Sequence, residues 1–418
     1  MANSAKGVFR DVFSNRNILA ISFTTTLWSI FNQAWQPYWG LWLQKELGVS
    51  IAIVGLLSTI QSAEQLLFQL PGGIIADKFG RKKIVLFGTS LRLIPPIIYL
   101  LATNWEHVLV AVIFNASASV YMPAFEAIVA DSLPSRQRGA GYGAYRMVTS
   151  LPRIFMPTLG GVAMDVLGYK EGVKIFNILT IFTVTATLII RAKLITETLD
   201  RKGEHKEARH TSTRETLLSA FKVHRTIWVM MFVATLGGFG LRMVMQLMPI
   251  YAKDFIGLTN TQIGFASTAS SALSTILIMP IGMLSDRIGR KVLILVGEVL
   301  TPFTMIGFVL VKDFPQYFIL QLVTGIGSAM GGRHMGFAGG PAWQALIADL
   351  VPKEKRGTIN GIISTVSGAI GTPSPYLGSY IWETYSPEAS FIVSTTIALI
   401  SIPIFAIFAK DPKKGEEE

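Results

Sequence analysis

Long apolar stretches recur along the whole chain, and they restrict its fold more than any other feature. Each is about 20 residues long, which is the length that an α-helix needs to cross a hydrocarbon layer of about 30 Å. Half of the residues are hydrophobic and only 15% are charged, so a water-soluble domain could not bury all the apolar side chains. The short alternating segments typical of membrane β-strands do not occur in the sequence. The sequence therefore predicts an all-α protein that crosses a membrane many times.

Twelve such stretches are expected to be transmembrane helices. They lie at roughly 18–43, 51–75, 84–103, 106–130, 141–167, 173–192, 226–252, 261–284, 292–312, 314–348, 358–383 and 386–409. The first is long enough to span a bilayer, so it is interpreted as a helix and not as a cleaved signal. The predicted domains are an N-terminal six-helix bundle at 1–195, a polar linker of mixed charge at 196–225, and a C-terminal six-helix bundle at 226–418.

Positive charge is distributed unevenly between the two sides of the predicted membrane. Most Lys and Arg residues are assigned to one side, whereas the opposite loops hold Lys45, Lys170, Lys174, Lys253 and Lys312. The residues on the basic side lie in the N-terminal segment, the two basic stretches at 78–83 and 287–291, the central segment at 191–225 and the tail, together with Arg136, Arg138, Lys353, Lys355 and Arg356. Because basic loops remain on the cytoplasmic side, both termini are predicted to lie in the cytoplasm, in a multi-pass protein of the cell membrane. This distribution explains the net charge of +11 without nucleic acid as a partner. The expected partners are a small-molecule substrate, protons and the lipid bilayer, and the expected state is a monomer.

A short basic stretch, called the hinge here, occurs twice in the chain. The first copy is Gly73–Lys83 and the second is Gly282–Lys291, shifted by 209 residues, which is half of the 418-residue chain. The similarity extends beyond the hinges, because Pro123–Asp131 matches Pro341–Asp349 at a shift of 218. The change of shift implies nine extra residues inside the tenth span. Both hinges are expected on the same side, so the two halves form a parallel repeat.

The hinge resembles the signature of the major facilitator superfamily, which lies between the second and third helices of that family. Asp77, Gly80, Arg81 and Lys82 match it in the first copy, and the second copy matches at Gly282, Leu284, Asp286, Arg287, Gly289, Arg290 and Lys291. The resemblance implies two pseudo-symmetric six-helix bundles around a central cavity that opens alternately to each side.

The hinge residues also have a direct physical interpretation. Gly73 permits close approach of a neighbouring helix and Gly80 permits a tight turn, while Asp131 is the expected ion-pair partner of Arg81. Such charges at the membrane surface would hold one state of the transporter closed and release in the other. The alternative is that the basic residues only determine topology. The predicted gating residues are Gly73, Asp77, Gly80, Arg81, Asp131, Asp286, Arg290 and Asp349.

The fifth span resembles the antiporter motif of the family. Pro157–Gly161 matches its end, whereas Pro152 and Met156 replace its two leading glycines. In the family this motif accompanies export by exchange. The fourth span reads Asn115–Ser119 where proton-coupled exporters of the family carry an arginine before a glycine.

Ionisable residues at membrane depth cost at least about 2.5 kcal/mol each, and they usually mark a pathway or a buried pair. Glu64 lies near the middle of the second span, and the second copy carries Leu273 in its place. Glu64 is therefore the candidate proton carrier, and the alternative is a permanent ion pair with Arg92 or Arg153. Arg242 aligns with Gln33 and could bind an anionic group or pair with Glu64.

The predicted substrate-binding residues come mainly from the first, fifth, seventh and tenth spans. The glycine-rich insert Ala329–Phe337 is expected to be an unwound segment facing the cavity, and the alternative is a widened extracellular loop. His334 in this insert could titrate near neutral pH. The predicted set is Trp28, Asn32, Gln33, Trp35, Arg153, Arg242, Gln246, Arg333 and His334.

The leading hypothesis is a secondary transporter that exports a small amphipathic or hydrophobic compound by alternating access and uses the proton gradient. The alternative is uptake or facilitated diffusion of a polar or anionic metabolite. A sensor or lipid scramblase is a further possibility from another class. The sequence contains no phosphate-cradling loop, no nucleophile–base spacing, no metal cluster and no cysteine. We therefore expect no cofactor, no metal and no enzyme activity.

Overall fold

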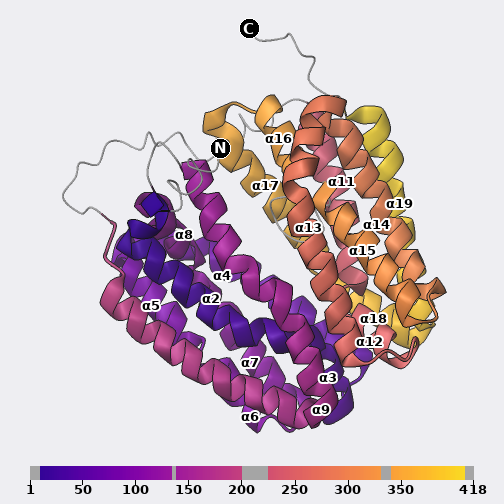
Figure 1. Ribbon diagram of the computed structural model, residues 1–418, viewed down its shortest axis with the longest axis horizontal. Coiled ribbons are helices and arrows are strands. Elements are labelled where there is room, and N and C mark those ends of the chain that lie inside the picture. The colour runs from indigo at the N-terminus through magenta and orange to yellow at the C-terminus, as the bar shows by residue number, and fades with distance from the viewer. Residues whose placement is uncertain (1–9, 134–137, 200–224, 331–339, 410–418) are drawn as a thin grey trace. The chain divides into compact units, whose positions relative to one another are not determined.

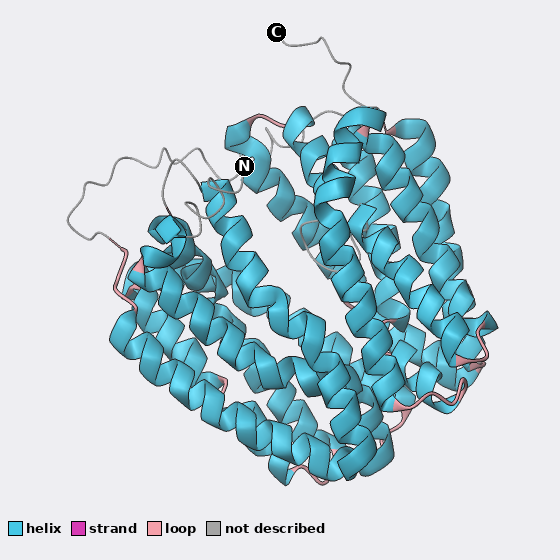
Figure 2. Ribbon diagram, viewed as in Figure 1, coloured by secondary structure: helices cyan, strands magenta, loops and turns pink. Residues whose placement is uncertain are grey.

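The computed structural model describes residues 10–133, 138–199, 225–330 and 340–409, and these residues form helices joined by short loops (Figure 2). No strand occurs in the described residues. The chain divides into two compact units. One contains Met1–Lys202 together with Thr259–Thr268, and the other contains Gly203–Leu258 together with Ala269–Glu418.

The helices of the first unit run from indigo to magenta in Figure 1. They are α2 (Arg16–Trp35), η1 (Gln36–Tyr38), α3 (Trp39–Leu47), α4 (Ile51–Phe79), α5 (Arg81–Leu91), α6 (Ile94–Leu101), α7 (Trp105–Ser117), η2 (Ala118–Tyr121), α8 (Met122–Ser132) and α9 (Arg138–Leu194). α9 is kinked at Gly168, whose φ of 78° lies in the left-handed region, so it holds the fifth and sixth spans. These helices overlap the first six expected spans, although several extend past the expected ends, as α4 does to Phe79.

The helices of the second half of the chain follow the same order. They are α11 (Arg225–Val244), α12 (Met248–Asp254), α13 (Asn260–Ile288), α14 (Arg290–Leu310), α15 (Phe314–Met330), α16 (Pro341–Leu350), α17 (Lys353–Gly371), α18 (Ser374–Thr384) and α19 (Pro387–Phe408). They occupy the last six expected spans. Eight stretches of the described chain are long and apolar enough to cross a membrane, and one of these, Gly141–Leu194, contains both arms of the kinked α9.

Proline divides several spans into two helices. Pro95 and Pro96 stand in the first turn of α6, and Pro123 stands in the first turn of α8. Proline has no N–H and favours the first turn of a helix, so each run of helix starts afresh at these residues. The ninth span differs, because α14 continues through Pro302 as a single helix.

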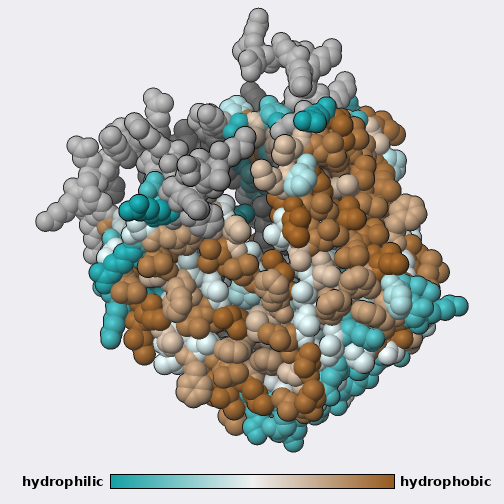
Figure 3. All heavy atoms as spheres, in the orientation of Figure 1, coloured by the Kyte–Doolittle hydropathy of each residue, from teal (hydrophilic) through white to brown (hydrophobic). Residues whose placement is uncertain are grey.

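Each unit has its own apolar core. In the first unit Ile18, Ile21 and Ile128 are fully buried, and in the second unit Trp343 and Phe405 stack at the centre. Large apolar side chains are nevertheless exposed along the outer faces of many helices, and the hydrophilic colour gathers near the helix ends (Figure 3). So much exposed apolar surface is typical of helices that face lipid.

The duplication is visible in the backbone. Gly80 and Gly289, 209 residues apart, have φ/ψ of 99°/136° and 98°/146°, and each joins two helices. Gly48 and Gly257, also 209 apart, have φ of 61° and 77°. Residues with a Cβ rarely adopt these conformations, so both copies of each turn favour glycine.

Candidate functional site

An ion pair joins the first hinge to the end of the fourth span. Nη1 of Arg81, the first residue of α5, contacts the Asp131 carboxylate in α8, as expected from the sequence. The same nitrogen donates a hydrogen bond to Thr198 Oγ1 at 3.2 Å. The two charged side chains are 18% and 40% exposed, so the pair sits at the boundary between protein and solvent.

Sequence reasoning missed Glu197, which caps α5. Its carboxylate accepts hydrogen bonds from the backbone N–H groups of Arg81 and Lys82, at 3.3 and 3.1 Å. These N–H groups have no partner within the helix, and a carboxylate there is also favoured by the helix dipole. Because Glu197 lies in the segment that we had placed in the linker, no local pattern could have connected it with a helix that begins 116 residues earlier.

The second hinge repeats this arrangement. Nη1 of Arg290 contacts the Asp349 carboxylate and also donates to the backbone carbonyl of Ala345, so α14 is tied to α16. Nζ of Lys291 donates to the carbonyl of Ala406 in α19 at 2.6 Å. Gly73 and Asp77 lie in α4 and Asp286 lies in α13, but these three positions are outside the residues whose side-chain surroundings are described.

Glu64 lies in α4, and its Oε2 is buried without a hydrogen-bond partner. Within the described chain it forms no ion pair with Arg92 or Arg153, so the alternative of a permanent pair with one of them is wrong. Arg153 is exposed on α9.

The polar and aromatic residues of the first span do not share one environment. Trp28, Asn32 and Gln33 are half-buried. Trp35 is only 4% exposed and packs edge-on against Trp42 and Tyr99, with ring centroids 6.2 and 5.2 Å away. This packing favours a structural role for Trp35. Trp42 is likewise only 4% exposed.

Arg242 and Gln246 are held by the second unit itself. Nη1 of Arg242 donates to the Ser367 carbonyl at 3.1 Å, and a side chain at Gly371 would collide with the guanidinium. Nε2 of Gln246 is 3.3 Å from both the Pro375 carbonyl and Ser379 Oγ. Arg333 and His334 lie outside the described residues, and the flanking helices end at Met330 and begin at Pro341.

The antiporter-like motif packs closely against two other segments of the first unit. A Cβ at Gly160 would collide with the Ala34 carbonyl, and a Cβ at Gly161 would collide with that of Asn260. The Tyr38 hydroxyl donates to the carbonyls of Pro157 and Asn260, at 2.8 and 3.1 Å. The glycines therefore allow helix backbones to approach closely.

Asp165, which sequence reasoning also missed, binds the start of α13. Its carboxylate accepts hydrogen bonds from the backbone and side chain of Asn260, at 3.0 and 2.8 Å. It accepts two more from the backbone and side chain of Thr261, both at 2.7 Å. All these residues belong to the first unit. A carboxylate from a distant helix thus serves as the cap of α13.

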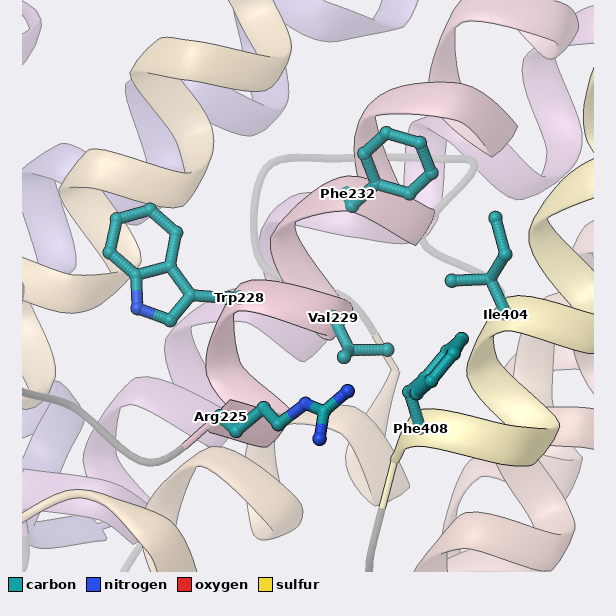
Figure 4. A pocket seen from close by; sticks show the side chains of 6 residues that line it. All are labelled: Arg225, Trp228, Val229, Phe232, Ile404 and Phe408. Atoms are coloured by element: carbon teal, nitrogen blue, oxygen red, sulfur yellow. The ribbon is translucent and has the colours of Figure 1, made fainter.

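A shallow groove of the second unit lies between the ends of α11 and α19 (Figure 4). The Arg225 guanidinium extends toward the Phe408 ring, 5.1 Å from its centroid. The groove is lined by Arg225, Trp228, Val229, Phe232, Ile404 and Phe408, none of which was predicted as a site residue.

Comparison with known proteins identifies the family of the chain. The model of the Major Facilitator Superfamily matches residues 18–260 and 230–418. The chain is 28% identical over 194 residues to the quinolone resistance protein NorA of Staphylococcus aureus, a match that covers 46% of this chain and 47% of NorA. The match thus spans about half the length of NorA. An uncharacterized MFS-type transporter of Methanocaldococcus jannaschii is 24% identical over 412 residues, covering 96% of both chains.

Solved structures show the same fold at low sequence identity. A bacterial homologue of the human lysosomal transporter Spinster aligns with a TM-score of 0.73 and 15% identity, covering 95% of this chain and 98% of that one. The nucleoside transporter NupG aligns with a TM-score of 0.71 and 15% identity, covering 94% and 99%. With the family model matching both halves, and with a hinge and its ion pair in each half, the chain belongs to the major facilitator superfamily, a family of membrane transporters and not of enzymes.

Proposed function

We propose that the protein is a secondary active transporter that works by alternating access and exports a small amphipathic or hydrophobic compound in exchange for protons. The observation that carries the proton coupling is the Glu64 carboxylate. It lies in an apolar helix with Oε2 buried and unpartnered, and no described cation neutralises it. A carboxylate in this setting is costly when ionised, so it favours taking up a proton and releasing it when water reaches it.

Export is supported by two independent observations. NorA, about half of which aligns with this chain, is named for quinolone resistance. The Pro157–Gly161 motif is similar to the fifth-helix motif that accompanies export in the family. Its glycines pack against backbone carbonyls, which is consistent with the role of such a motif in close helix packing.

The hinge ion pairs support a gating role on the side that we assign to the cytoplasm. Arg81–Asp131 and Arg290–Asp349 tie the start of one span to the end of another in each unit. Both pairs are partly exposed, so each is weak enough to exchange partners during a transport cycle. We place the protein in the cell membrane as a monomer, with both termini in the cytoplasm.

The alternative, uptake or facilitated diffusion of a polar or anionic metabolite, is favoured by Arg242. Its guanidinium is half-buried, and it makes a hydrogen bond to a neutral carbonyl, without an ion-pair partner in the described chain. Among proteins of the same fold are one named as a nucleoside transporter and one named as a peptide transporter.

The test uses purified protein in proteoliposomes with an imposed pH gradient and norfloxacin, a fluorescent quinolone, as the probe. We expect uphill accumulation of norfloxacin that a protonophore abolishes. Glu64→Gln should lose this gradient-driven flux, whereas Glu106→Gln, at an exposed acid in the first turn of α7, should retain it. Equal gradient-driven flux in Glu64→Gln would remove Glu64 as the proton carrier. If the protein transports succinate but does not transport norfloxacin, the alternative is favoured.

A further inference from the structure

Arg92 lies at an interruption of the third span. α5 ends at Leu91 and α6 begins at Ile94, so Arg92 and Leu93 fall between two helices. Pro95 and Pro96 lack N–H groups, so the carbonyls of Leu91 and Arg92 lose the donors that a continuous helix would supply. Irregular backbone at membrane depth is tolerated where it faces protein or a wet cavity. The interruption therefore exposes polar backbone groups within an otherwise apolar unit.

Two aromatic rings hold the Arg92 guanidinium. Its Cζ lies 4.0 Å from the Trp28 ring centroid and 5.0 Å from that of Tyr121, which are cation–π distances. Tyr121 is fixed in turn, because it is 4% exposed and packs on Gly88, where any side chain would collide with the ring. The guanidinium thus has a rigid apolar support on α2 and η2.

The hydrogen-bonding donors of Arg92 are not used by the described protein. Its Nε is buried without a partner, and no hydrogen bond or ion pair links its guanidinium to a described residue. Arg191 lies beside the same Tyr121 ring and forms a cluster with Arg92, but its hydrogen-bonding donors are used. It is 3% exposed and donates to the hydroxyls of Thr24, Thr89 and Thr25 at 3.1, 2.9 and 3.4 Å. The unit therefore provides acceptors for one arginine and leaves the donors of the other open.

The cluster also carries uncompensated positive charge. Arg191 lies 5.8 Å from the Tyr121 ring centroid, so both guanidinium groups border the same ring. No carboxylate lies within ion-pair distance of either group in the described part of the chain. Arg191 lies at the end of the sixth expected span and was counted among the basic residues of the cytoplasmic side, but it is buried in α9. A bound anion would offset the repulsion between the two arginines.

We propose that Arg92 and Trp28 form a subsite for the acidic group of an aromatic organic anion. This inference rests on the proposed transport function and narrows its substrate class to acid-bearing amphiphiles. A carboxylate accepts hydrogen bonds from the open guanidinium edge, which is the geometry that arginine and carboxylates share. The aromatic body of the ligand lies beside Trp28, which is half-buried and presents an apolar face.

The experiment measures binding of naphthoate and of naphthamide, its neutral analogue, by isothermal titration calorimetry. The full-length protein is held in lipid nanodiscs without any gradient. We expect Arg92→Gln to weaken naphthoate binding by about tenfold or more and to leave naphthamide binding unchanged. The matched control is Arg225→Gln, which removes an arginine that also lies over a ring but in the second unit. It should change neither affinity.

Trp28→Leu tests the aromatic support separately, with an expected loss of about threefold or more in naphthoate affinity. Thermal unfolding of each variant in the same nanodiscs identifies those that are misfolded. If Arg92→Gln is misfolded, Arg92→Lys replaces it, because lysine lacks the planar guanidinium that binds a carboxylate through two hydrogen bonds. Unchanged naphthoate affinity in a folded Arg92 variant overturns the subsite, as does an equal loss of naphthoate and naphthamide. Because no gradient is present, this outcome leaves gradient-driven norfloxacin transport to be judged on its own result.

Discussion

Asp165→Ala should loosen the start of α13. The wild-type carboxylate accepts four hydrogen bonds from Asn260 and Thr261, between 2.7 and 3.0 Å. Two of them come from backbone N–H groups in the first turn, which have no partner within the helix. Thr259 supplies the next acceptor, because its Oγ1 accepts from the Gln262 N–H at 3.1 Å. Asp165 therefore carries most of the capping of this helix.

The expected magnitude follows from the exposure of the site. Hydrogen bonds to a charged group contribute about 1.5–3 kcal/mol each, but the Thr261 bonds are exposed and water can replace the lost acceptor. Loss of a cap costs about 1–2 kcal/mol, and loss of a carboxylate beside the helix dipole adds about 0.3–1 kcal/mol. We therefore expect local opening of the first turn of α13 to become easier by about 2 kcal/mol, which is roughly thirtyfold.

Hydrogen–deuterium exchange with peptide-level mass spectrometry measures this opening directly. Peptides covering residues 258–266 should exchange roughly thirtyfold faster in Asp165→Ala, and those covering the second half of α13 should not change. Asp313→Ala is the matched control, since Asp313 caps α15 by accepting from the Gln316 N–H at 3.0 Å. It should affect α15 alone. Equal exchange at 258–266 in wild type and Asp165→Ala would refute the reasoning.

Two further predictions concern the hinges. Gly80→Ala and Gly289→Ala should each destabilise the protein by about 1–2 kcal/mol, because φ near +99° is strained for any residue with a Cβ. Gly282→Ala, where no atom lies within 4 Å of the added methyl, should not, as thermal unfolding in detergent would show. A double-mutant cycle of Arg81→Gln and Asp131→Asn should give a coupling of at most about 1 kcal/mol, because the pair is partly exposed. A coupling above about 3 kcal/mol would contradict that interpretation.

The fold could be predicted largely from the sequence, because its determinants are local. Apolar length locates the spans, and the repeated Gly80 and Gly289 locate two equivalent turns. The Arg81–Asp131 pair was also predictable, since Arg81 begins a span and Asp131 ends one on the same side.

The remaining contacts depend on which helices lie side by side. The carboxylates of Asp165 and Glu197 cap helices that are far away in the sequence, so no spacing rule identifies them. Arg191 follows an apolar run and resembles a residue at a helix end, yet threonine hydroxyls from two other helices surround it. Trp35 is confined by Trp42 and Tyr99 rather than open to a ligand.

The unbroken α14 indicates that the two copies of the repeat have different roles. At the positions that correspond to Glu64 and Arg92, the second copy has Leu273 and Thr301, and the Thr301 hydroxyl turns back to the Gly297 carbonyl of its own helix. Both copies keep the glycine turns and the hinge ion pair. The two ionisable groups, Glu64 and Arg92, occur in the N-terminal copy alone. A protein assembled from two C-terminal copies would preserve the architecture and lack both charges.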